Sequence, residues 1–279
     1  MFRYTYNTLV YGQEPMAIGI ARIARFGYQG VEIVGEPTQA DIAAIKRELA
    51  RNEVVASSIL SIYTPKRDIV SSNPSIRRAA IDYVKGNIDY AVALGANVVT
   101  FTPTAVGKIV AEVDIKQEWA WAVEAAREIA PYAGDHGIRI AVEPWNRYET
   151  YLINRMEQSA AFVDEVDHPA VGCMGDTFHM AIEEADIADA FRLAGHRLAH
   201  VHLADSNRAA PGFGHTDFRP IVQALADIKY SGWVSYELLP AAGDVWGVLS
   251  GAGAPEFLDP YTEAAIKHTQ AIEAELGIA

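Results

Sequence analysis

Two kinds of hydrophobic pattern alternate along the chain. Short apolar runs, of which residues 138–142 are an example, are typical of buried strands. Between them lie longer segments whose apolar residues recur with the helical period, as Ile76, Ala80, Val84 and Ile88 do. Strands and helices that alternate in this way predict βα units and a parallel sheet.

The predicted elements follow one another without a linker or a change of composition. The expected strands cover residues 2–6, 30–34, 54–62, 97–101, 138–143, 171–176, 198–202 and 233–237. The expected helices cover residues 15–26, 38–50, 75–94, 115–132, 156–166, 187–194, 218–230 and 260–276, with Thr38 capping the second. Eight such units predict a single (β/α)8 TIM barrel that forms one domain over residues 1–279. An open doubly wound sheet is the alternative, but no glycine-rich phosphate loop follows the first strand.

Four consecutive strands end in a polar residue that is out of phase with their apolar residues. Because side chains alternate along a strand, Glu143 faces away from Val142, and Asp176, His202 and Glu237 end their strands in the same phase. The active sites of TIM barrels lie at this end of the strands. Carboxylate and imidazole ligands together suit a divalent cation. A hydrogen-bonded strand end could explain any one of these residues, but four in phase predict a metal site.

Three further polar residues lie in the loops that directly follow these strands. Glu149 comes six residues after Glu143, His179 three after Asp176, and Arg208 six after His202. We predict that Glu149, His179 and Arg208 contact a bound substrate. The alternatives are a salt bridge between Glu149 and Arg147, a helix cap at His179, and a solvated loop arginine at Arg208.

Other residues with reactive side chains are expected to have structural roles. His200 shares the inward phase of His202 and is expected one layer deeper in the barrel. Glu32 and Arg139 are also expected to face inward, where a pair between them is one option. The single cysteine, Cys173, has the outward phase and is expected to be a small core residue.

The composition of the chain argues against some classes of function. The net charge of −13 argues against nucleic acid as a partner, since that binding depends on cationic contacts with phosphates. No segment approaches the length of a membrane span, and the first residues lack the pattern of a signal peptide. With a lone cysteine, these features lead us to expect a cytoplasmic protein without membrane contacts.

The motifs around the polar strand ends resemble those of a known enzyme family. They are Glu143-Pro-Trp-Asn-Arg-Tyr-Glu149-Thr, Asp176-Thr-Phe-His179-Met, His202-Leu-Ala-Asp-Ser-Asn-Arg208 and Tyr236-Glu237. In order and spacing they are similar to the D-tagatose, D-psicose (D-allulose) and L-ribulose 3-epimerases. These ketose 3-epimerases belong to the xylose-isomerase-like TIM barrel superfamily. The likeness is clear over residues 141–237 and extends, through the barrel periodicity, over most of the chain.

The resemblance implies an isomerase that epimerises C3 of a free, non-phosphorylated keto sugar through a cis-enediolate. It implies Mn²⁺ as the cofactor, with Co²⁺ or Mg²⁺ as alternatives, and a homo-oligomer that is a dimer or tetramer. The cation would be held by Glu143, Asp176, His202 and Glu237. Glu143 and Glu237 would exchange the proton from opposite faces of C3, which suits inversion because one face needs a base and the other an acid.

The same resemblance assigns the three loop residues to the O1–O3 end of the sugar. Tyr6 ends the first expected strand and is predicted to line the sugar pocket. The same barrel and polar residues would also suit other functions. They are C1–C2 isomerisation of a sugar or keto-inositol, a dehydratase or lyase reaction on the same metal site, an endonuclease IV-like activity and a non-catalytic sugar-binding module. The acidic charge disfavours the endonuclease, and a binding module would leave the opposed carboxylates without a role.

Overall fold

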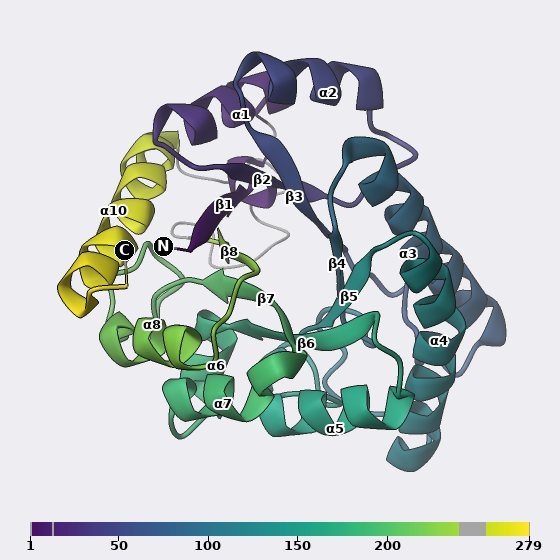
Figure 1. Ribbon diagram of the computed structural model, residues 1–279. Coiled ribbons are helices and arrows are strands. Elements are labelled where there is room, and N and C mark those ends of the chain that lie inside the picture. Colours follow the sequence, from purple (N-terminus) through teal and green to yellow (C-terminus); the bar gives the residue numbers. More distant parts are fainter. Residues whose placement is uncertain (1, 13, 240–254, 279) are drawn as a thin grey trace.

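The strands form a closed parallel barrel in which each strand pairs with the next and β8 returns to β1 (Figure 1). The computed structural model describes residues 2–12, 14–239 and 255–278. The strands are β1 (Arg3–Asn7), β2 (Gly30–Val34), β3 (Val55–Leu60), β4 (Val98–Phe101), β5 (Arg139–Val142), β6 (Val171–Asp176), β7 (Leu198–Leu203) and β8 (Trp233–Tyr236). The predicted (β/α)8 barrel is therefore confirmed.

Helices surround the barrel on its outside (Figure 1). Those expected from the sequence are α1 (Met16–Arg25), α2 (Ile42–Arg51), α3 (Pro74–Leu94), α4 (Ile115–Asp135), α5 (Met156–Val166), α7 (Ile187–Ala194), α8 (Phe218–Asp227) and α10 (Leu258–Leu276). Short 3-10 turns cover Thr8–Tyr11, Gly195–Arg197 and Pro255–Phe257. Among the described residues, none of the helices combines the length and apolar character needed to cross a bilayer.

Two details of the helices differ from the sequence prediction. The second helix begins at Ile42 with Asp41 as its cap, not at Thr38, because the Asp41 side chain accepts the backbone N–H of Ala44. A short helix, α6 (Thr177–Glu183), was not predicted. Its seven residues are too few to show a helical period, and it begins directly at the end of β6.

The phase of the strands separates an outer from an inner layer of side chains. Ile140, Val142, Cys173 and Val201 belong to the large core between strands and helices. The alternate positions face inward, where Val98, Ala141, Met174 and Ala199 form a small cluster inside the barrel. Cys173 thus lies in the outer core, as its phase predicted. The inward phase continues to the polar residues at the strand ends, and this is what brings them to one site.

Hydrogen bonds connect α10 to the first and last strands, where this helix completes the ring around the barrel. Tyr4 Oη donates to Glu273 Oε2 over 2.8 Å, and the backbone N–H of Phe2 donates to Glu273 Oε1 over 2.7 Å. Tyr236 Oη donates to Thr269 Oγ1 over 2.7 Å. Because these groups are buried, each hydrogen bond also satisfies a polar atom that water cannot reach.

Candidate active site

The four predicted metal ligands lie together at the carboxyl end of the barrel. Asp176 ends β6, His202 lies within β7, and Glu143 and Glu237 directly follow β5 and β8. All four side chains are buried. Glu143, Asp176 and His202 each offer a ligand atom within 4.8 Å of the others. Glu237 lies beside this group, with its Oε2 3.9 Å from His202 Nδ1.

Two atoms of this group are suited to a cation because they lack a partner among the described residues. Asp176 Oδ2 and His202 Nδ1 lie 3.8 Å apart, and neither has a hydrogen-bond partner within the described part of the chain. The other oxygen of Asp176 is already used, since Oδ1 accepts the N–H of Phe178 at the start of α6. Burying unpaired polar atoms costs about 1–3 kcal/mol each. A divalent cation with oxygen and imidazole ligands would satisfy both, so the residues fit such a cation.

The electrostatics of the cluster also fit a positive ion. Burial raises the pKa of Glu143 well above its usual value, and the Glu237 and Asp176 carboxylates raise it further. Burial likewise raises the pKa of Asp176 to about 6. For His202, burial alone would lower the pKa, but the surrounding carboxylates, Glu32 foremost, raise it to about 10. Without a cation, this cluster therefore holds protons that a cation would displace.

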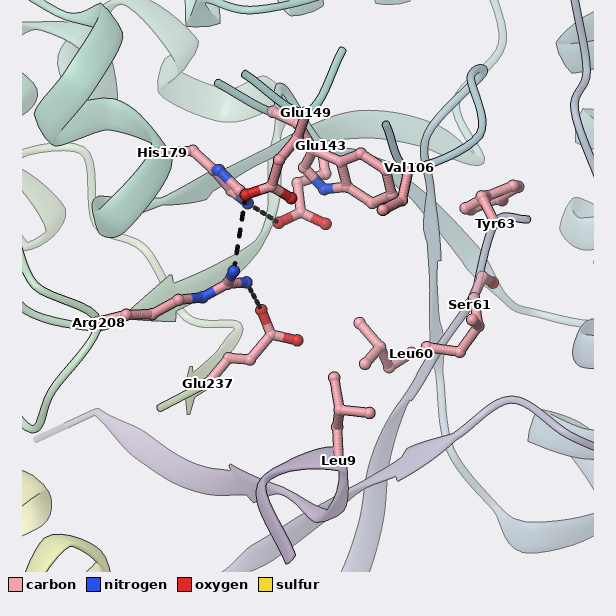
Figure 2. A pocket seen from close by; sticks show the side chains of 12 residues that line it. Leu9, Leu60, Ser61, Tyr63, Val106, Glu143, Glu149, His179, Arg208 and Glu237 are labelled. Atoms are coloured by element: carbon pink, nitrogen blue, oxygen red, sulfur yellow. Dashed lines mark hydrogen bonds and ion pairs between the residues drawn. The ribbon is translucent and has the colours of Figure 1, made fainter. Parts of the chain in front are cut away.

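The predicted substrate residues meet next to these ligands (Figure 2). Arg208 is buried, and its Nη2 donates to Glu237 Oε2 over 2.8 Å. Its Nη1 lies 3.7 Å from Glu149 Oε1, and its guanidinium lies 4.7 Å from the centre of the Phe178 ring. The Arg208 backbone has a φ of 60°, an uncommon left-handed conformation for a residue other than glycine. The alternative of a solvated loop arginine is therefore wrong.

His179 is held in one tautomer by Asn146. The backbone N–H of Asn146 donates to His179 Nδ1 over 3.3 Å, and Asn146 Nδ2 lies 2.8 Å from the same atom. Burial lowers the pKa of His179 well below its usual value, so the ring is neutral and Nε2 carries the proton. This Nε2 lies 4.0 Å from Glu143 Oε1. His179 lies inside α6 and does not cap it.

Glu149 contacts the same asparagine. Its Oε1 accepts a hydrogen bond from Asn146 Nδ2 over 3.0 Å. The alternative pair between Glu149 and Arg147 is not formed, because Arg147 turns to Glu183, with Nη2 and Oε2 2.8 Å apart. Asn146 therefore links the two predicted substrate residues His179 and Glu149.

These side chains face a pocket with about 400 Å³ of empty space. Its polar side consists of Glu143, Glu149, His179, Arg208 and Glu237. The remaining lining residues are largely apolar: Leu9, Leu60, Ser61, Ile62, Tyr63, Val106 and Trp145. The pocket therefore offers a charged end and an apolar end to a small ligand.

Tyr6 does not belong to this pocket, so its predicted role is wrong. Its ring lies in the outer core, 5.5 Å from the centres of both Tyr11 and Tyr28. The strand continues to Asn7, which has the opposite phase. Asn7 Nδ2 donates to Glu237 Oε1 over 3.1 Å, so Asn7 is the residue of β1 that reaches the site.

Sequence reasoning missed Asn7, Asn146 and the partners of Glu32. Asn7 carried a usable signal, since a strand one residue longer would have placed it on the inner face. Asn146 lies between Glu143 and Glu149 in the same motif, but nothing local shows that it reaches His179. The suggested pair between Glu32 and Arg139 is also wrong. Arg139 donates to the carbonyl oxygens of Arg197 and Leu198, over 3.3 and 3.4 Å.

Comparison with known proteins agrees with this geometry. Residues 20–248 match the family model of the xylose isomerase-like TIM barrel. The chain is 32% identical over 262 residues to a D-psicose 3-epimerase of Ruminiclostridium cellulolyticum, with 88% of each chain covered. It is 34% identical to an L-ribulose 3-epimerase of Methylomonas sp., covering 84% of this chain and 83% of the relative.

Solved structures give the same result. A D-allulose 3-epimerase from Methylomonas sp. in complex with D-allulose superposes with a TM-score of 0.88 at 29% identity, covering 97% of this chain and 96% of the other. A D-psicose 3-epimerase with D-tagatose from Clostridium cellulolyticum superposes with a TM-score of 0.86 at 28% identity, covering 97% and 99%. The chain therefore belongs to the xylose isomerase-like TIM barrel family and, within it, to the ketose 3-epimerases, which are isomerases.

Proposed function

We propose that this protein inverts C3 of a free ketose, using Glu143 and Glu237 as the proton-transferring groups and a divalent cation as cofactor. The observation that carries the proposal is the pair of buried carboxylates that enter one small pocket from two strand ends, β5 and β8 (Figure 2). Inversion at carbon requires removal of a proton from one face and delivery to the other. Two carboxylates on different sides of a bound sugar meet that requirement.

The cation would be held by Glu143, Asp176, His202 and Glu237, and we propose Mn²⁺, with Co²⁺ or Mg²⁺ as alternatives. When bound, it would supply a Lewis acid that polarises the sugar's oxygens and makes the C3 proton more acidic. The unpaired Asp176 Oδ2 and His202 Nδ1 support this assignment. The proposed metal site thus rests on two atoms that have no other partner in the described part of the chain.

The chain's own residues prepare both carboxylates for proton transfer. Asn7 and Arg208 each donate to one oxygen of Glu237, over 3.1 and 2.8 Å, which fixes the orientation of that carboxylate. Glu143 is buried at the same pocket, and its Oε1 lies 4.0 Å from His179 Nε2. Each carboxylate would then act as the base in one direction and as the acid in the other.

We propose that Glu149, His179 and Arg208 bind the O1–O3 end of the sugar. His179 Nε2 bears its proton toward the pocket because Asn146 occupies Nδ1, so it can donate to a sugar oxygen. Arg208 can donate with nitrogen atoms beyond the one that contacts Glu237. Glu149 can accept from a hydroxyl group. The other end of the sugar would lie against the apolar residues of the pocket.

The charge of the pocket supports a sugar without a phosphate group. Among the described residues that line it, Arg208 is the one permanent cation, and Glu237 and Glu149 lie beside it. The three glutamates of the lining would repel a phosphate, and tight phosphate sites use free arginines, lysines or helix N-termini. The D-allulose and D-tagatose complexes of the structural neighbours support the same substrate class.

The test is incubation of the purified protein with Mn²⁺ and a panel of free ketoses in D₂O, followed by NMR. The proposal predicts deuterium at C3 together with an inverted product. Deuterium at C1 or C2 would instead indicate an aldose–ketose isomerase. Loss of water from the sugar would indicate a dehydratase, and either result would overturn the proposal.

A further inference from the structure

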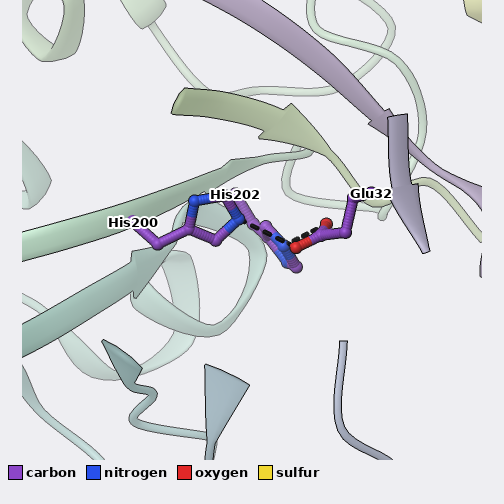
Figure 3. A group of neighbouring side chains, drawn as sticks. All are labelled: Glu32, His200 and His202. Atoms are coloured by element: carbon purple, nitrogen blue, oxygen red, sulfur yellow. Dashed lines mark hydrogen bonds and ion pairs between the residues drawn. The ribbon is translucent and has the colours of Figure 1, made fainter. Parts of the chain in front are cut away.

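A buried carboxylate that the proposed reaction does not use, Glu32, reaches two histidines across the interior of the barrel (Figure 3). It lies on β2, whereas His200 and His202 lie on β7, and β1 and β8 separate these two strands in the barrel. None of these three side chains is exposed. A carboxylate buried this deeply needs partners for both oxygens.

Each oxygen of Glu32 faces one serine and one histidine. Oε1 accepts from Ser58 Oγ over 2.8 Å and lies 2.8 Å from His200 Nε2. Oε2 accepts from Ser235 Oγ over 2.7 Å and lies 2.7 Å from His202 Nε2, a contact that is short but poorly aligned for a hydrogen bond. With a hydroxyl donor on each oxygen, the carboxylate acts as an acceptor on both sides.

These contacts decide which nitrogen of His202 carries a proton. Two lone pairs 2.7 Å apart would repel each other, so the proton between Glu32 Oε2 and His202 belongs to Nε2. The opposite nitrogen, Nδ1, is then the one that can be free of a proton and bind a cation. It points to the proposed metal site, 3.8 Å from Asp176 Oδ2 and 3.9 Å from Glu237 Oε2.

A cation between Glu32, His200 and His202 is a competing interpretation, since these three residues also gather their ligand atoms within 4.8 Å. The distances disfavour it. The histidine nitrogen atoms already lie only 2.7 and 2.8 Å from the Glu32 oxygens, and both of these oxygens already accept serine hydroxyls. Both oxygens of Glu32 therefore have hydrogen-bond donors within the protein, whereas Asp176 Oδ2 and His202 Nδ1 have no hydrogen-bond partner among the described residues.

We infer that Glu32 is a positioning residue for the cofactor: it holds the Nε2 proton of His202 and so presents Nδ1 to the divalent cation. The inference rests on the proposed function, because it takes His202 as a ligand. Partners of this kind fix the ring and strengthen a histidine ligand, and their loss typically weakens metal binding 10–100-fold. His200 shares the same carboxylate and fixes its other oxygen.

Isothermal titration of the metal-free protein with Mn²⁺ measures the effect of Glu32→Gln. This change keeps the size of the side chain but leaves one acceptor oxygen for four donors. We expect a Kd raised about 10–100-fold and a smaller rise in Tm on addition of Mn²⁺. Thr5→Val is the matched control, since it removes the buried hydrogen bond between Thr5 and Ser57 inside the barrel and leaves the Ser57–Ser58 and Ser58–Glu32 contacts in place. Its Kd should stay within about twofold of wild type.

A measurement on the unchanged protein covers the case in which Glu32→Gln does not fold. ¹⁵N-histidine NMR with diamagnetic Mg²⁺ should show His202 protonated at Nε2, with the cation-induced shift at Nδ1. A proton on Nδ1, or equal Mn²⁺ affinity in wild type and Glu32→Gln, would overturn the inference while leaving the proposed function intact. Wild-type protein that binds neither Mn²⁺ nor Mg²⁺ would overturn both.

Discussion

Arg208 Nη2 donates to Glu237 Oε2 over 2.8 Å, and this contact joins a proposed substrate residue to a proposed proton-transferring residue. Both residues are about 4% exposed. Arg208 holds a left-handed backbone conformation to reach this position. Strained residues of this kind persist where the surrounding structure fixes them, and they cluster at functional sites. The pair therefore couples binding of the sugar to the orientation of Glu237.

Arg208→Ala should lower both turnover and apparent sugar affinity while Mn²⁺ stoichiometry stays near one per chain. A displaced catalytic group can cost on the order of 10²-fold in rate. Removing one partner of a buried pair also costs about 3–5 kcal/mol of stability, so the measurements should be made well below Tm. Steady-state kinetics and metal analysis of the same sample test this.

Arg147→Ala is the matched control, because this exposed arginine lies in the same region but pairs with Glu183. Its kcat and KM should stay close to those of the wild type. Loss of metal in Arg208→Ala would show that Arg208 supports the cation site and not the sugar.

Tyr6 and Asn7 are neighbours in sequence, but Tyr6 lies in the outer core and Asn7 contacts Glu237. Substitutions at the two positions should therefore have different effects on turnover. Tyr6→Phe removes a hydroxyl that has no hydrogen-bond partner among the described residues, so kinetics should be unchanged and Tm unchanged or slightly higher. Asn7→Ala removes the donor to Glu237 Oε1 and the acceptor for the N–H of Leu9. We expect turnover to fall roughly tenfold, the equivalent of one hydrogen bond to a charged group. Equal effects of the two changes would contradict the inward phase of Asn7.

Binding of Mn²⁺ should release protons and weaken as the pH falls. In the metal-free protein the pKa of His202 is about 10, so the cation displaces a proton from it at neutral pH. Below about pH 6 it must also displace the proton of Asp176, whose pKa is about 6. Affinity should therefore fall at least tenfold per pH unit from pH 8 to 6, since the pKa of Glu143 is raised as well, and more steeply below pH 6.

Titration calorimetry in buffers of different ionisation enthalpy counts the released protons directly. The expected number is at least one at pH 7 and larger at pH 5.5. Binding without proton release at both pH values would show that these two residues are not ligands. Asp176→Asn should remove the additional slope below pH 6, together with most of the affinity.

The strand phases were predictable from the sequence because the alternation of side chains is a local property. That phase placed Glu143, Asp176, His202 and Glu237 at one end of the barrel, and the structure brings them together. The same reasoning failed at Tyr6, where ending a strand one residue early selects the wrong face. Strand boundaries are thus where pattern analysis has the least information.

Contacts between distant strands could not be predicted from the sequence. Glu32 was correctly expected inside the barrel, but its partners come from β3, β7 and β8, which only the closed topology brings within reach. Asn146 reaches His179 because the loop after β5 folds over α6. Such partners depend on the three-dimensional path of the loops, and no local period records that path.

In the proposed mechanism Glu143 and Glu237 act on opposite faces of C3, and deuterium exchange by their glutamine variants tests this arrangement most directly. Glu143→Gln and Glu237→Gln each keep a neutral oxygen of similar size but cannot carry the proton. With bound metal verified in each sample, both variants should lose net epimerisation, because a general acid–base group is typically worth about 10²–10⁴-fold. The remaining carboxylate should still exchange the C3 hydrogen that faces it. In D₂O the two variants should therefore label opposite epimers of the sugar pair. Labelling of the same epimer by both variants, or epimerisation near the wild-type rate by either, would contradict the two-face mechanism.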